Sequence, residues 1–198
     1  MPAKVAAQGR PRRAEVDTNI IDAALVEMKS KGLSHLTLEA VAVRAGVGRP
    51  TVYRRYRNKE ELVRAVLMAK VPNLSIQKTD DPVEDLISMA VTFAHDLDKS
   101  GLLSVVISAH AEARHNPVMA KALKTDYLLP RNASIVESIQ RALGSGDLVP
   151  VEPETVRDLL FGPLIYRLLI VGDNVTSAGL RELAETAMSG IRTTKQRP

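Results

Sequence analysis

One short segment combines the residue types that recognise nucleic-acid bases. Residues 49–59 carry cationic, hydroxyl and small side chains, among them Arg49, Thr51 and Arg54. Arginine can donate two parallel hydrogen bonds to O6 and N7 of guanine, threonine can offer a methyl group to thymine, and proline makes apolar contact. At about 100° per residue, Arg54 points almost opposite to the apolar side of its helix. The spacing therefore predicts a small, cationic ridge that fits a major groove about 12 Å wide.

Two kinds of DNA contact are expected from this ridge. The side chains from Arg49 to Thr51, together with Arg54, are expected to read base edges. Tyr53 and Arg49 stand on the edge of the ridge, where phosphates are closer than bases. Lys59 is expected to bind a phosphate, because its ammonium adds to the positive end of a following helix. The residues predicted to bind DNA are Arg13, Thr37, Arg49, Pro50, Thr51, Tyr53, Arg54, Arg55 and Lys59. The competing interpretation is a charged helix face that is only solvated.

Charge is unevenly distributed along the chain. The protein has 198 residues and a formal net charge of +4. Residues 1–70 hold 14 Lys and Arg against 7 Asp and Glu, whereas residues 71–198 hold 13 against 16. Between Glu39 and Glu60 there is no acidic residue. A basic front and a mildly acidic remainder indicate that only the front meets a polyanion.

The ridge is expected on the second of two short helices. Thr37 is a good N-cap for the first of them, which ends where Gly46 can adopt a left-handed conformation. Pro50 suits the first turn of the next helix, where its missing N–H costs no hydrogen bond. Two short helices around a glycine-containing turn predict a helix-turn-helix over residues 37–56, whose second helix enters the major groove.

Two further helices are predicted to flank this motif. The preceding helix is expected to be capped by Asp17 or Thr18 and to stop at Gly32. The following helix is expected to start at Asn58, with Glu61 three residues later completing a capping-box-like pair. The Ala-, Gly-, Pro- and Arg-rich residues 1–13 have no periodicity and predict a flexible basic arm. The arm contains Gly9-Arg10-Pro11, similar to an AT-hook, so minor-groove contact and a solubilising tail both stay open.

The same segment resembles the DNA-binding module of the TetR (tetracycline-repressor) family of bacterial transcription regulators. The resemblance covers residues 14–62. Gly48 departs from the family pattern, because glycine caps a helix without a side-chain bond. Outside the module, the chain is similar in length, in helical pattern and in the turn Gly146-Asp147-Leu148. The matching residues are Thr37-Leu38, Ala42, Ala45-Gly46-Val47, Thr51-Val52-Tyr53, Tyr56, Asn58-Lys59 and Glu61-Leu62.

The remaining residues also predict helices. A polar linker over residues 72–82 precedes helical patterns up to residue 191, interrupted near Pro130 and at residues 144–153. No segment alternates with a period of two, so no strand is expected. The predicted fold class is all-α: a three-helix helix-turn-helix DNA-binding domain followed by a helical ligand-binding and dimerisation domain. The predicted divisions are residues 1–13 (arm), 14–71 (DNA-binding domain) and 72–198 (helical body).

The last two helices are predicted to pair with a second copy of the chain. Residues 159–170 are apolar on more than one face, and a helix that is apolar nearly all round is buried on nearly all sides. The resemblance implies a four-helix bundle between two protomers, and the alternative is that these helices only fill the monomer core. The predicted dimerisation residues are Leu160, Leu164, Leu168, Leu180, Leu183 and Ala187.

A small-molecule effector is implied by the resemblance alone. The helical body of such regulators encloses a ligand cavity, and apolar or aromatic side chains are the natural lining, although most such residues are core. The residues named for this role are Met89, Phe93, Met119, Tyr127 and Tyr166.

Other classes of function are disfavoured. Without cysteine, the chain has no thiolate metal site and no cysteine nucleophile. His110 and His115, on either side of Glu112, are five residues apart and do not share a helix face as residues four apart do, so we expect no metal and no cofactor. Phosphate-binding loops and nucleophile elbows are absent from the sequence, and no enzyme is expected. No signal peptide or membrane span is predicted.

The sequence therefore predicts a cytoplasmic, homodimeric repressor that binds a palindrome in double-stranded DNA and responds to a small molecule. A constitutive DNA-binding protein without an effector is the first alternative. An enzyme or small-molecule carrier with an incidental basic front is the second.

Overall fold

The computed structural model describes residues 10–74, 76–172 and 175–193, with the side chains of residues 10–13, 130, 131 and 134 left out of the description. Within these residues the chain forms helices without a strand, as predicted. An isolated antiparallel bridge joins Leu148 and Arg192 and does not extend into a strand. In the described part, no helix has the length and apolarity needed to cross a membrane.

The chain divides into two compact units, which we call unit 1 and unit 2. Unit 1 comprises residues 1–71 and 105–127, and unit 2 comprises residues 72–104 and 128–198. The first boundary lies after Val71, and the segment 105–127 is in the same unit as the helix-turn-helix. The predicted domain divisions stay a prediction.

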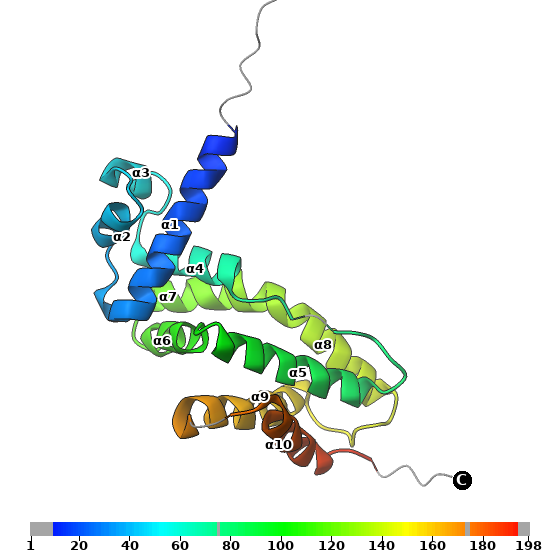
Figure 1. The fold of residues 1–198 in the computed structure, drawn as a ribbon. Coiled ribbons are helices and arrows are strands. Elements are labelled where there is room, and N and C mark those ends of the chain that lie inside the picture. Colours follow the sequence, from blue (N-terminus) through cyan, green and yellow to red (C-terminus); the bar gives the residue numbers. More distant parts are fainter. Residues whose placement is uncertain (1–9, 75, 173–174, 194–198) are drawn as a thin grey trace, which may run out of the picture. The chain divides into compact units, whose positions relative to one another are not determined.

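Unit 1 contains the helix-turn-helix (Figure 1). Helix α2 packs against α1, α3 packs against α2, and α4 packs against α1. The inward side chains are fully buried and recur at helical spacing, for example Ile20 and Ala24 on α1, Val41 on α2, and Leu62 and Val66 on α4. The helices are α1 (Arg10–Lys31), the 3₁₀ turn η1 (Leu33–His35), α2 (Leu38–Arg44), α3 (Arg49–Tyr53), α4 (Lys59–Lys70), α6 (Leu103–Ala113), α7 (Pro117–Lys121) and the π-helical η2 (Ala122–Leu128).

Helix α1 begins at Arg10, so the predicted caps at Asp17 and Thr18 are wrong. The residues before Asp17 contain no helix breaker once Pro11 has taken its place in the first turn, where proline is tolerated. Both predicted caps make other interactions: the Thr18 hydroxyl donates to the Ala14 carbonyl oxygen at 3.0 Å, and Asp17 pairs with Arg55.

Unit 2 is a second helical core, in which α5 and α9 each contact α8 and α10 packs on both α5 and α9. The predicted apolar stripe of α5, including Leu86, Ala90 and Leu97, is buried. Phe93 meets Phe161 of α9 edge to face, with ring centroids 6.4 Å apart. Its helices are α5 (Pro82–Lys99), α8 (Leu129–Gly144), α9 (Pro153–Tyr166), the π-helical η3 (Arg167–Val171) and α10 (Ser177–Ser189).

The predicted interruption near Pro130 is a widened helical turn. The π-helical η2 directly precedes α8, which has Pro130 in its first turn. Because proline has no N–H to donate, it interrupts the regular ladder of helical hydrogen bonds, and a π-helical turn accommodates the break. Helical backbone therefore continues through the break, while its hydrogen-bond register changes.

Candidate nucleic-acid interface

The turn between α2 and α3 is built from the local signals that the sequence contains. The Thr37 hydroxyl oxygen caps α2 by accepting from the Ala40 N–H at 3.1 Å. Gly46 has φ = +65°, and the Val47 N–H donates back to the Ala42 carbonyl oxygen at 3.1 Å. This is the Schellman arrangement, in which a left-handed residue closes the helix. The predicted cap at Thr37 and the predicted left-handed Gly46 are both confirmed. The Thr37 hydroxyl oxygen is thus used to cap α2.

The third helix also has its predicted start. Gly48 is the N-cap and makes no side-chain capping bond, and Pro50 lies in the first turn. Next along the chain, Asn58 caps α4 by accepting from the Glu61 N–H at 2.8 Å, while Glu61 accepts from the Arg57 N–H at 2.9 Å. These caps fix where α3 and α4 begin.

Helix α3 has one buried side and one exposed side. Val52 is fully buried and Tyr56 is half-buried, so this side packs inward. Arg49, Pro50 and Arg54 are exposed, and Thr51 is half-buried beside them. We call these four residues the reading ridge. Its cations and small side chains form a surface of the chemistry that base edges require.

Arg55 is held inside unit 1. Its Nε donates to the Asp17 carboxylate of α1, and its Nη1 donates to the Thr51 carbonyl oxygen at 3.2 Å. Only 14% of the Arg55 side chain is exposed. This cation therefore fastens α3 to α1, a use that its position in the sequence does not reveal.

Lys59 is engaged as well. Its ammonium lies 2.9 Å from a carboxylate oxygen of Glu112 on α6 and donates to the Leu33 carbonyl oxygen at 3.2 Å. The neighbouring Glu60 accepts from the Asn116 amide at 2.8 Å. The start of α4 is thus tied to the segment 105–127 within unit 1.

Tyr53, the last residue of α3, donates its hydroxyl hydrogen bond to Glu39 in the first turn of α2. The residue is 44% exposed. This hydrogen bond, with help from the nearby Arg49 charge, lowers the pKa of Glu39, and it raises the pKa of Tyr53. Tyr53, which is predicted to lie at the edge of the ridge, therefore has its hydroxyl bonded to a carboxylate.

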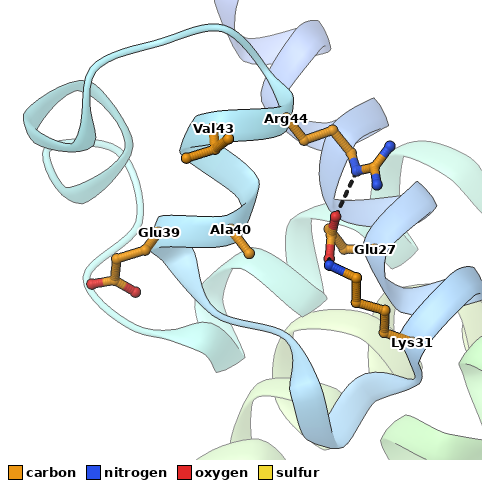
Figure 2. A pocket seen from close by; sticks show the side chains of 6 residues that line it. All are labelled: Glu27, Lys31, Glu39, Ala40, Val43 and Arg44. Atoms are coloured by element: carbon orange, nitrogen blue, oxygen red, sulfur yellow. Dashed lines mark hydrogen bonds and ion pairs between the residues drawn. The ribbon is translucent and has the colours of Figure 1, made fainter.

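A shallow groove lies between α1 and α2 (Figure 2). Glu27 is almost completely buried beneath it and is paired with Arg44 at 2.6 Å and with Lys31 at 2.9 Å. Figure 2 shows both cations directed at Glu27, while Glu39 points away from them. Hydrogen bonds from Lys31 and then Arg44 lower the pKa of Glu27. The pair with Arg44 fixes α2 on α1 and so positions the helix that carries the turn.

Glu27 and Glu39 were not among the residues that the sequence singled out, and the other two partner acids were considered only in different roles, Asp17 as a helix cap and Glu112 beside two histidines. Each pairs with a residue at least 14 positions away, apart from the bond between Glu27 and Lys31. No local spacing marks such pairs. The available signal is the charge pattern alone: acids that flank an acid-free cationic segment are the natural partners of its cations.

The predicted ligand residues are divided between the two units. Met119 and Tyr127 are buried in unit 1, whereas Met89 is buried and Phe93 is half-buried in unit 2. Tyr166 is 60% exposed, which does not suit a residue inside a closed cavity. Arg13 lies outside the described side chains, and the rest of the basic arm, residues 1–9, lies outside the described chain.

Four of the six predicted dimerisation residues belong to the core of unit 2. Leu160, Leu164 and Leu180 are fully buried and Leu168 is nearly so. They are buried among the helices of the same chain, and their part in a dimer stays a prediction. Leu183 and Ala187 of α10 are partly exposed. Close in sequence to these buried leucines, three large apolar side chains are exposed: Tyr166, Ile170 and Val171.

Among the described residues there is no group of three or more histidine, aspartate or glutamate side chains that could hold a metal ion. His110 instead bonds through Nδ1 to the Val106 carbonyl oxygen at 2.8 Å, and Glu112 pairs with Lys59. Of the residues first considered as metal ligands, His110 is therefore bonded to the backbone of its own helix, and Glu112 takes part in an ion pair.

Two short, capped helices that expose a cationic ridge define a helix-turn-helix DNA-binding protein. Residues 20–66 match the model of bacterial regulatory proteins of the tetR family, and residues 76–187 match the tetracyclin repressor-like C-terminal domain. The chain belongs to the TetR family of transcriptional regulators. Its relatives in this family are regulators and not enzymes.

Individual relatives agree with this assignment. The uncharacterized HTH-type transcriptional regulator YdeS of Bacillus subtilis is 27% identical over 190 residues, which cover 94% of this chain and 95% of YdeS. A TetR family transcription regulator from Marinobacter aquaeolei has the same fold, with a TM-score of 0.72, 19% identity and coverage of 94% and 100% of the two chains. The flavonoid-responsive regulator FrrA is also similar, with a TM-score of 0.67, 19% identity and coverage of 89% and 95%.

Proposed function

We propose that this TetR-family regulator is a homodimeric repressor that binds a palindromic operator and is released from it by a small molecule. The observation that carries the DNA-binding part is the reading ridge. Its cations Arg49 and Arg54 are exposed, whereas the opposite side of α3, at Val52, is fully buried. Helix α3 is held by caps and by Arg55, so the ridge is presented by a fixed element.

Within the ridge, Arg54 and Arg49 would read guanine edges, and Pro50 and Thr51 would contact neighbouring bases. One such helix covers too little surface for a specific site, so a second copy is required. In a two-fold dimer the two recognition helices would lie about 34 Å apart and read the two halves of a palindrome. Such a protein would work in the cytoplasm, where the DNA is.

The dimer surface that we propose differs from the one expected from the sequence. It comprises the exposed Tyr166, Ile170 and Val171 of α9 and η3, with the partly exposed Leu183 and Ala187 of α10. Large apolar side chains seldom gather on the surface of a monomer unless they meet a partner. Buried Leu164 and Leu180 would support this surface from below.

The response to a small molecule rests on the contacts of α4. The ion pairs Lys59–Glu112 and Arg64–Asp126, and the bond from Asn116 to Glu60, join α4 to the segment 105–127. A ligand that moved this segment would therefore move α4 and the recognition helix with it. It would act only if it bound the shape that releases DNA more tightly than the shape that binds it. The flavonoid-responsive FrrA supports such a role for this fold.

The experiment is a footprint on the DNA upstream of the gene that encodes the protein, with wild type and Arg54→Ala. We expect two protected half-sites related by two-fold symmetry. Arg54→Ala should weaken operator binding by about 1–3 kcal/mol and relax the preference at one base pair in each half. Arg157→Ala, at an exposed arginine of α9 in unit 2, is the matched control and should leave the footprint unchanged.

The outcome also separates the alternatives. Equal losses on the operator and on random DNA would contradict base reading by Arg54. A single, asymmetric half-site would contradict the dimer. A footprint that no compound from a broad panel of small aromatic and aliphatic effectors removes would favour the constitutive DNA-binding protein.

A further inference from the structure

The hydrogen bond between Tyr53 and Glu39 places an anion at the edge of the reading ridge. Tyr53 ends the recognition helix α3, and Glu39 lies in the first turn of α2. The phenol donates to the carboxylate across the two helices. A tyrosine hydroxyl has one proton to donate, so while it serves Glu39 it cannot donate to a DNA phosphate.

Within the described part of the chain Glu39 has no ion pair of its own, unlike the other acids of the motif, although the charge of Arg49 is near enough to lower its pKa. Asp17 is paired with Arg55, and Glu27 is paired with Arg44 and Lys31. Among the ion pairs of the described residues, none includes Glu39. The hydrogen bond from Tyr53 lowers the pKa of Glu39, so the carboxylate stays ionised at neutral pH.

A negative charge at this place weakens binding to DNA of every sequence. Binding without sequence preference depends on attraction between cations and phosphates, whereas preference comes from base contacts. A carboxylate beside Tyr53 repels the backbone and also occupies a neutral donor that would otherwise bind it. Both effects weaken the contribution common to all sequences and leave the base contacts of Arg49 and Arg54 in place.

We propose that Glu39 is a specificity-determining residue, which holds Tyr53 away from the phosphate backbone and suppresses binding to non-operator DNA. The inference rests on DNA binding by the reading ridge. It requires no ligand and no second protomer. Glu39 acts through Tyr53 and through its own charge, so the two contributions can be separated by substitution.

The test measures binding to a mixed-sequence 30-base-pair duplex without a palindrome, over a series of NaCl concentrations, by fluorescence anisotropy. Glu39→Gln removes the charge and keeps an acceptor. We expect it to bind this duplex about fivefold more tightly at low salt, the ratio that corresponds to two unit charges about 4 Å apart in water. The gain should shrink as the salt concentration rises.

Tyrosine provides the second arm of the test. In the wild-type background Tyr53→Phe should change the affinity by less than about twofold, because the hydroxyl already serves Glu39. In the Glu39→Gln background the phosphate competes better for the phenol than a neutral amide does, and Tyr53→Phe should cost about fivefold. The two substitutions are thus expected to be non-additive. Glu39→Asp, which keeps the charge and shortens the reach, should lie between wild type and Glu39→Gln.

A matched control and the thermal midpoint separate this role from a structural one. Asp98→Asn removes one exposed negative charge from α5 in unit 2 and should alter binding by less than about twofold. If Glu39→Gln and Glu39→Asp bind like wild type, or more weakly with a lowered Tm, Glu39 serves the helix alone and the proposal is overturned. A wild-type protein that ignores both operator and random duplex at low salt would overturn DNA binding itself.

Discussion

Units 1 and 2 both hold their helices with local caps and long-range ion pairs, but the caps serve different purposes. In unit 1 the turn of the helix-turn-helix is shaped by bonds between near neighbours. Thr37 caps α2 by accepting from the Ala40 N–H, Asn58 caps α4 by accepting from the Glu61 N–H, and Gly46 closes α2. Unit 1 also has long-range pairs, such as Asp17 with Arg55, and unit 2 has local caps of its own at Asp81 and Thr176. Some ion pairs of unit 2 likewise connect residues far apart in the chain. The carboxylate of Glu84 pairs with Arg181 at 2.7 Å, and Asp81 pairs with Arg192 at 2.5 Å. In unit 1 the local caps shape the exposed turn of the recognition element, whereas in unit 2 they begin helices of a buried core.

Each unit nevertheless contains one nearly buried acid that is held by an arginine. Asp85 in unit 2 pairs with Arg141 and accepts from the Thr79 hydroxyl at 2.7 Å, just as Glu27 in unit 1 pairs with Arg44. Burial raises the pKa of Asp85, but the hydrogen bonds from Thr79 and Arg141 outweigh it and lower the pKa below its ordinary value of 3.8. Glu27 has two cations, whereas Asp85 has a single cation, and this difference can be tested.

The largest expected effect comes from removing the single cation. Arg141→Met should leave Asp85 buried without an opposite charge and destabilise the protein at neutral pH by about 3–5 kcal/mol. Arg44→Met in unit 1 should destabilise less, because Lys31 still pairs with Glu27. Chemical denaturation of both variants measures the difference, with Arg157→Met, at an exposed pair, expected to change the free energy of unfolding by about 0–1 kcal/mol.

The pH dependence gives a second readout of the same variants. A lowered pKa means that the folded state gains stability from Asp85 above about pH 3.8, the ordinary value, and loses it as the pH falls through the folded pKa. The gap between wild type and Arg141→Met should therefore close in acid. A gap that is constant down to acid pH, or equal losses for Arg141→Met and Arg44→Met, would remove the contrast between the two acids.

An intermediate effect is expected at the turn of the helix-turn-helix. Gly46→Ala forces an L side chain into the left-handed region at φ = +65° and should cost about 1–2 kcal/mol. In unit 2 the matched substitution Gly144→Ala lies within α8, has open space around the new Cβ atom, and should stabilise by about 0.5–1 kcal/mol. Thermal unfolding of the two variants should thus shift in opposite directions. Shifts of the same sign would show that turn conformation does not govern unit 1.

The smallest expected effect concerns the contact of α4 with α6. Lys59→Ala should weaken binding to all duplexes alike and reduce the salt slope by about one, if the ammonium leaves Glu112 for a phosphate. Glu112→Gln should then strengthen binding by up to about threefold, because the competing charge is gone. Titrations at several salt concentrations measure both. An unchanged slope in Lys59→Ala would mean that Lys59 only fastens α4 to α6.

Local sequence was sufficient for the helices and caps of the recognition element. The caps at Thr37 and Asn58, the left-handed Gly46 and the position of Pro50 depend on residues at most five positions apart, and all were predicted correctly. The helical stripe of α5 was predicted for the same reason, since burial at helical spacing is visible in the residues themselves. The start of α1 was not, because a good capping residue can lie unused inside a longer helix.

The sequence by itself determined that this chain is helical, that its positive charge is concentrated in the N-terminal part, and that Pro50, Thr51 and Arg54 share one side of a short helix with Arg49 at its edge. Only the tertiary structure decided which polar groups are free. Arg55, Lys59 and Tyr53 are all engaged by acids from other helices, and Leu160 and Leu164 turn into their own core. The physical reason is range: a cap is made by its neighbours, whereas an ion pair or a buried face depends on which distant helix the fold brings beside it.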